Sequence, residues 1–228
     1  MISARSLAIS LFCAVLAAPL IYAQDLSTYR EFQFGMNLPA IAKLAGRKPS
    51  EAKVLHQRPA LIQELTWQPP FSRSSSPDAD PVWNTIFRFY NGELYRIVVN
   101  YKRNKTAGMT PEDLVEAISA MYGTPTTPSA EIAFSLSEVY NDSQVALTRW
   151  EDSRYSFSLF RSSYQPTFGM LAVSKHLDAL ARDATIEAIR MDKQEAPQRE
   201  MEQQRTQEEA RRTAQEKARL LNKPQFRP

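Results

Sequence analysis

Apolar and polar side chains alternate along much of this chain, a pattern typical of β-strands that bury one face. The alternation is interrupted by proline, glycine and serine clusters, which are typical of turns and loops. It predicts strands over residues 60–68, 82–89, 93–101, 144–150, 154–162 and 167–174. An antiparallel sheet of short strands is therefore the expected centre of the fold.

The Asn91-Gly92 pair joins the two strongest strands and predicts a tight hairpin. A two-residue loop would pair Phe87 with Arg96 and place the best apolar residues on opposite faces. A three-residue loop pairs Phe87 with Tyr95 and gathers one apolar face, with Gly92 in the left-handed position of a bulge. We therefore predict the three-residue loop.

Helical spacing of apolar residues appears between the strands. Three helical segments are predicted, over residues 37–44, 50–57 (one or two turns) and 110–122, and a last helix begins near Lys175. Asn37 and Thr110 are expected N-caps, because short polar side chains accept hydrogen bonds from the first turn of a helix. Gly46 and Gly123 then end the first and third helices.

Two segments of the chain resemble each other. Gly35-Met36 precedes the first helix, and Gly108-Met109 precedes the longer helix 73 residues later. Each helix ends at a glycine followed closely by proline, and three predicted strands follow each one. The sequence therefore predicts an α+β fold of two helix-plus-antiparallel-meander repeats, over about residues 32–101 and 108–175.

This Gly-Met, cap, helix, Gly-x-Pro and meander order resembles the small periplasmic domains of the SmpA/OmlA type. Its tandem form resembles the β-lactamase-inhibitory-protein-like fold. The resemblance implies a non-enzymatic protein that contacts other proteins through its sheet face or loops. This chain lacks the lipid-attachment motif and the cysteine pairs found in some members, so the resemblance transfers no individual functional residue.

Residues 1–23 have the features of a secretory signal peptide. Arg5 precedes an apolar stretch at residues 7–20, and Ala23 precedes the expected cleavage before Gln24. The stretch is shorter than the ~20 residues that a membrane-spanning helix needs, so no span is expected after cleavage. We therefore expect a periplasmic or secreted protein.

The single cysteine, Cys13, lies inside this leader. Phe12 precedes it where a lipoprotein needs a small residue, so no lipid anchor is expected. The mature chain is then free of thiols and disulfides, which favours bacterial export.

The amino-acid composition argues against several classes of function. The chain has 28 basic and 25 acidic residues, too small an excess for a dedicated nucleic-acid partner. Six glycines cannot build a dinucleotide- or phosphate-binding loop, and two distant histidines do not form a metal motif. We therefore expect no cofactor and no metal.

Charge also divides the mature chain. Residues 24–185 carry equal numbers of acidic and basic side chains, whereas residues 186–228 are charged, rich in Gln and Ala, and net positive. We predict a folded body at 24–185 and a tail at 186–228 that is helical or disordered. Pro197 is expected to interrupt or restart a helix there. Between Met201 and Leu220 the tail has no large apolar side chain for a coiled-coil seam, so it is a partner-binding spacer or a solvated appendage.

No catalytic residue stands out. Ser50 and Lys53 match Ser-x-x-Lys, but the companion motifs are missing, so a cap and a surface lysine explain them. Adjacent acidic pairs fall in turns or at a helix start, where local geometry accounts for them. We expect no enzyme, with an envelope hydrolase built from dispersed carboxylates as the alternative.

Aromatic residues are the better binding candidates. Trp67 and Phe71 flank two prolines that stiffen a loop, and Tyr164 lies in a turn before another proline. Trp67 can instead pack under the loop as core. The sequence thus predicts an exported, non-catalytic module that binds an unknown protein through Trp67, Phe71 and Tyr164. A further alternative is an inhibitor of a secreted enzyme that uses the loop at residues 67–81.

Overall fold

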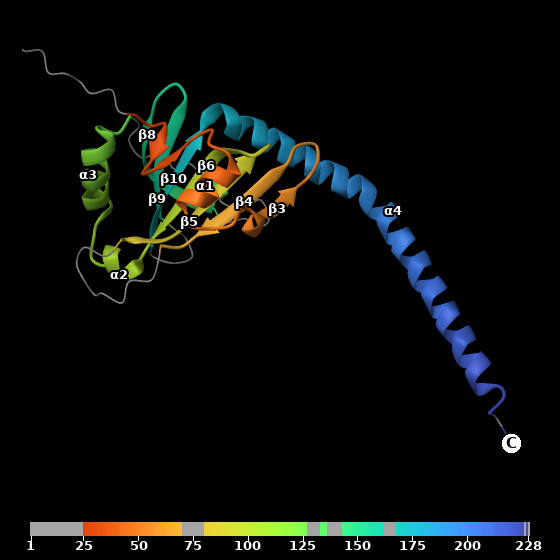
Figure 1. The fold of residues 1–228 in the computed structure, drawn as a ribbon. Coiled ribbons are helices and arrows are strands. Elements are labelled where there is room, and N and C mark those ends of the chain that lie inside the picture. Colours follow the sequence, from red (N-terminus) through yellow and green to blue (C-terminus); the bar gives the residue numbers. More distant parts are fainter. Residues whose placement is uncertain are drawn as a thin grey trace, which may run out of the picture.

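The computed structural model of this chain describes residues 25–69, 80–126, 133–135, 143–161, 167–225 and 227. These residues form an antiparallel sheet with helices on both faces and one long helix that extends away from it (Figure 1). The elements are β1 (Thr28–Tyr29), β2 (Phe32–Gln33), α1 (Leu38–Leu44), the 3-10 turn η1 (Pro49–Glu51), β3 (Lys53–His56), β4 (Ile62–Trp67), β5 (Val82–Tyr90), β6 (Glu93–Tyr101), α2 (Arg103–Thr106), α3 (Pro111–Tyr122), β7 (Ala133–Ser135), β8 (Ser143–Glu151), β9 (Tyr155–Arg161), β10 (Phe168–Ser174) and α4 (Lys175–Asn222).

The main sheet has eight strands in the order β3-β4-β5-β6-β10-β9-β8-β7, and every neighbouring pair is antiparallel. Each half is a meander of four consecutive strands, and the last strands of the two meanders, β6 and β10, pair at the centre. The α+β class and the antiparallel sheet predicted from the alternation are confirmed. Each meander gains one short outer strand that the sequence pattern did not predict.

One face of the sheet carries the main core. A single row of side chains crosses six strands through the registered partners Leu65, Phe87, Ile97, Ala172, Phe157 and Trp150. All six are almost fully buried. The β1–β2 hairpin, α1 and α3 cover this row, because their apolar side chains belong to the same cluster.

Aromatic contacts fix this cover on the sheet. The ring of Phe32 lies 4.6 Å from that of Phe87, and Tyr122 at the end of α3 lies 4.7 Å from Phe157. Trp150 Nε1 donates a hydrogen bond of 2.9 Å to the carbonyl of Gly123, the residue that ends α3. The helix therefore ends at a point held by a buried side chain of β8.

The β5–β6 hairpin corrects the predicted loop. The turn has two residues, Asn91 and Gly92, both with positive φ, and it pairs Tyr90 with Glu93. A register shift next to Arg88 then adds one residue to β6, so that Phe87 pairs with Ile97. The three-residue loop was wrong because the apolar register is restored by a bulge inside the strand and not by the turn.

The predicted helix starts are confirmed. Asn37 Oδ1 accepts a hydrogen bond of 2.9 Å from the Ala40 amide, and Thr110 forms a reciprocal capping box with Asp113. The one or two helical turns predicted over residues 50–57 form only at the start of that segment. Only the single turn η1 forms, and the chain then enters strand β3 and pairs with β4.

Helix α4 covers part of the opposite face of the sheet. Its buried side chains are Asp178, Ala181, Ala184, Thr185 and Ala188. Beyond this stretch the helix continues through Pro197, and every residue from 197 to 225 is exposed. Figure 1 shows this part of α4 extending away from the sheet to the C-terminal end of the chain. We call residues 197–222 the arm.

Candidate interaction surface

Helix α4 is anchored to the sheet by a buried ion pair. Arg96, at the centre of β6, donates from Nε and Nη2 to Asp178 Oδ1 at 2.9 and 2.6 Å. Both side chains are only 9% exposed. Arg182, one turn further along α4, lies 3.2 Å from Asp178 Oδ2 and adds a second positive charge. The first turns of α4 are therefore fixed by charge as well as by apolar packing.

The arginine of this anchor stands in a charged row on the sheet. Glu64, Arg88 and Arg96 are direct cross-strand partners on β4, β5 and β6. Two arginines opposite each other would repel. The repulsion is offset because Arg88 Nε lies 3.0 Å from Glu64 Oε2, whereas Arg96 is paired with the helix. The sheet thus supplies one cation that needs an acid from α4.

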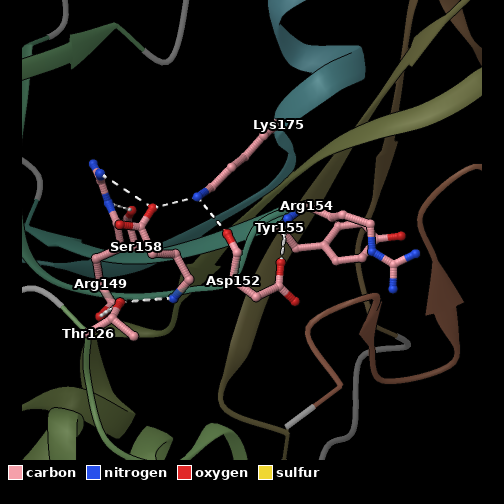
Figure 2. Close-up of polar contacts among 8 residues, drawn as sticks. Thr126, Arg149, Asp152, Arg154, Tyr155, Ser158 and Lys175 are labelled. Carbon is pink, nitrogen blue, oxygen red and sulfur yellow. Dashed lines mark hydrogen bonds and ion pairs between the residues drawn. The ribbon is translucent and has the colours of Figure 1, made fainter. Parts of the chain in front are cut away.

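The N-terminal end of α4 is held by the turn between β8 and β9, as Figure 2 shows. Lys175 Nζ donates to the carbonyl of Asp152 at 2.7 Å and lies 2.8 Å from a carboxylate oxygen of Glu151. Asp152 Oδ1 accepts hydrogen bonds from the amides of Arg154 and Tyr155, which closes the turn. This network ties the start of α4 to the second meander, while Asp178 ties it to the first.

A further contact marks the point at which α4 leaves the body. Arg58, in the loop between β3 and β4, lies 2.8 Å from Glu195. On the helix itself, Arg199 is paired with Asp192 at 3.1 Å. A polar recess of about 240 Å³ lies between this loop and the helix, and both of its arginines already face carboxylates. These contacts mark where α4 leaves the body, but both ion pairs are exposed and contribute little to holding the arm.

A separate polar cluster lies beside the main core, between the β1–β2 hairpin and the start of β5. Arg30 donates from both Nη atoms to the carboxylate of Asp80, at 2.8 and 2.9 Å. Burial raises the pKa of the Tyr29 and Tyr101 hydroxyls above their usual range, and it raises the pKa of Tyr122 to about 12. These tyrosines therefore stay neutral at physiological pH, and the Arg30–Asp80 pair is the charged centre of the cluster.

The Arg30 guanidinium holds the pKa of Asp80 below its usual value, which predicts a pH-dependent variant. A depressed carboxyl pKa stabilises the fold above the unfolded-state pKa of about 3.9, and that contribution is lost as pH falls through the lower folded-state pKa. We expect Asp80→Asn to lower the free energy of unfolding at pH 7 by roughly 1 kcal/mol, since a third of the carboxylate is exposed to solvent. Urea titrations at several pH values should show that the difference in free energy of unfolding between the variant and the wild type shrinks below pH ~4. If this difference in free energy of unfolding stayed constant down to pH ~3, the stabilisation would not come from the ionised carboxylate of Asp80.

The aromatic residues predicted to bind a partner are only partly placed. Trp67 ends β4, is half-buried, and packs edge-on against Phe32 with 5.8 Å between ring centroids. It belongs to the border of the main core. Phe71 and Tyr164 lie outside the described residues, so their positions relative to Trp67 are not described. Their role in binding stays a prediction.

Sequence reasoning missed the anchor of α4. Arg96 and Asp178 are 82 residues apart, and neither is part of a motif. One signal was available: Arg96 is the one charged residue inside the apolar run from Leu94 to Val99. A buried cation in such a strand requires an acidic partner, although the pattern does not say from which element.

Within the described segments, no group of three or more His, Cys, Asp or Glu side chains is placed to hold a metal ion. In the same segments, no helix combines the length and apolar character needed to cross a membrane. Comparison with family models, curated proteins and solved structures gives no match.

Proposed function

We propose that this chain is an exported, non-catalytic protein-interaction module that uses its arm to reach a partner. The observation that carries the proposal is α4: one helix of 48 residues that is fixed to the body over its first turns and exposed from residue 197 onward. A helix normally gains most of its stability from packing one face, so an exposed helix of this length is supported either by ion pairs along its own surface or by contact with another molecule, and we propose the second.

The proposal of export rests on the leader at residues 1–23, with its basic start, short apolar stretch and Ala23 before the cleavage point. A thiol-free mature chain is compatible with an oxidising compartment. We therefore propose a periplasmic or secreted location, with no lipid anchor.

We also infer that the body is an internal duplication of a helix and a meander. Helix α1 begins at Leu38 and helix α3 begins 73 residues later, at Pro111. In the centre of the sheet Val98 pairs directly with Leu171, which is also 73 residues away. This register is the one expected if a two-fold axis between β6 and β10 relates two copies. It supports the proposed relationship to SmpA/OmlA-type and β-lactamase-inhibitory-protein-like domains, whose binding is by protein contact.

The proposed function predicts that partner binding depends on the arm. With residues 24–228 as bait in an envelope extract of the source cells, we expect specific partners that are lost when the chain ends at Ala196. The Kd of a purified partner should weaken at least tenfold in the shortened chain, or about 1.4 kcal/mol, as measured by calorimetry. The shortened chain should unfold at the same urea concentration as the full one, because the arm adds no packed surface.

Trp67→Ala tests the aromatic site separately. If the arm carries binding, this variant keeps the partner, whereas a role for Trp67 would remove it. An identical set of partners with both the shortened chain and the full chain would contradict the proposed use of the arm.

A further inference from the structure

The arm carries an ordered line of alternating charge. Acidic and basic residues follow one another at spacings of three and four, which places them along one face of a helix. This charge ladder consists of Glu202, Arg205, Glu209, Arg212, Glu216 and Arg219. All six side chains are exposed, and each pair of neighbours repeats after seven residues. A repeat of seven residues keeps these charges in one line along a helix that is close to 3.5 residues per turn.

We infer that the arm pairs antiparallel with the arm of a second copy of this chain through the charge ladder. With the two-fold axis between Ala210 and Arg211, Glu202 of one copy lies opposite Arg219 of the other. Glu209 likewise meets Arg212, and each such pair occurs twice by symmetry. This inference specifies one partner of the interaction module proposed above.

The third pair completes the match, since Arg205 then lies opposite Glu216 of the second copy. Every rung of the ladder therefore meets the opposite charge. Over residues 199–222 this arrangement sets no two like charges at the same level. A parallel arrangement in register would instead place each glutamate opposite a glutamate and each arginine opposite an arginine, which is unfavourable. Charge complementarity thus selects both a second copy and its direction.

The position of the apolar residues agrees with this arrangement. The large apolar side chains exposed on the arm are Met201, near its base, and Leu220 and Leu221, near its end. They are too far apart to form a seam within one arm. Met201 and Leu220 border the charge ladder, and antiparallel pairing brings Met201 to the level of Leu220 of the second copy, so apolar surface gathers at both ends of the paired region.

The length of the arm also fits. Residues 197–222 extend for about 39 Å as a helix, and the axis falls at the middle of this length. Because α4 is one continuous helix, each body lies at the base of its own arm, and the antiparallel direction sets the two bodies at opposite ends of the pair.

The same spacing also favours ion pairs within one arm, between residues three and four apart. Both roles use the same side chains, so an experiment must separate support of a single helix from pairing of two helices. Reversing the sign of whole sets of charges achieves this separation.

The experiment is sedimentation velocity on the mature chain, residues 24–228, over a range of protein concentrations. We expect a monomer–dimer equilibrium at roughly 10–100 µM protein in 50 mM salt, because exposed ion pairs contribute little each. At 500 mM salt the dimer should weaken about tenfold or more, since screening acts on exposed charges.

Two charge-reversal variants, measured separately and mixed, test whether the ladders of two chains pair with each other. E202R/E209R/E216R makes the ladder wholly basic, and R205E/R212E/R219E makes it wholly acidic. Each variant alone should be monomeric, and an equal mixture should form a heterodimer. A variant with all six signs reversed keeps the complementarity and should dimerise like the wild type.

Q203R/Q207R/A210R is the matched control, because it adds three charges on a different face of the arm. It should keep the dimer. Far-UV circular dichroism of every variant checks that the arm stays helical.

A wild-type chain that remains monomeric at 100 µM and 50 mM salt would overturn the inference. So would loss of the dimer in the control variant, which would move the contact to the other face. Neither result bears on capture of a different protein by the arm, which the shortened chain tests independently.

Discussion

Asp178→Ala is expected to lower the free energy of unfolding by about 3–5 kcal/mol, one of the two largest effects predicted for this chain. The carboxylate is buried and holds both Arg96 and Arg182. Removing it takes the acidic partner on α4 away from the buried guanidinium of Arg96, and a buried charge that loses such a partner is costly. Urea denaturation at pH 7, followed by tryptophan fluorescence and circular dichroism, measures the change.

Two control variants make this prediction specific. Asp183→Ala removes an exposed acid from the same helix and should change stability by less than about 0.5 kcal/mol. The double variant R96M/D178L replaces the pair with apolar side chains and should recover most of the loss, because such replacements are often neutral. A loss below about 1 kcal/mol for Asp178→Ala would show that the ion pair does not anchor α4.

Trp150→Ala is expected to cost about 3–5 kcal/mol, because it removes a large side chain from a packed core. Trp150 is 1% exposed and closes the row that crosses the sheet to Leu65. Its Nε1 also satisfies the carbonyl of Gly123, so the variant weakens the end of α3. Thermal and urea unfolding would both show the loss.

Trp150→Phe separates the loss of the hydrogen bond from the loss of the ring, and Trp83→Ala is the control at an exposed tryptophan. Trp150→Phe keeps an aromatic ring and loses the hydrogen bond, for which we expect about 1–3 kcal/mol. Trp83 is 59% exposed, so Trp83→Ala should cost less than about 1 kcal/mol. If Trp150→Ala and Trp83→Ala lowered the free energy of unfolding equally, Trp150 would not be part of the packed core.

Local sequence signals predicted much of the fold. The six strands found by alternation all form, and the caps Asn37 and Thr110 act as expected, because an N-cap depends only on residues within one turn. The hairpin at Asn91 shows the limit of such signals. The turn type is local, but the bulge beside Arg88 depends on which face the whole sheet buries.

The candidate surface was less predictable. A change in composition near residue 186 suggested a boundary, yet Ala188 is still buried and one helix runs from Lys175 to Asn222. The composition of a segment indicates how exposed its residues are on average. It does not show where a helix ends, because one helix can be packed over its first turns and exposed beyond them. Pro197 lies within that helix, so it marks neither an interruption nor a restart.

The sequence alone determined the six longer strands, the two helix caps and the spacing of the charges on the arm, because each depends on residues a few positions apart. Tertiary structure decided the order of the two meanders, the bulge in β6 and the union of body and arm in one helix. These features depend on contacts between distant residues, above all Arg96 with Asp178. Such a pair is favourable only after the sheet has removed the arginine from water, and no local pattern encodes that requirement.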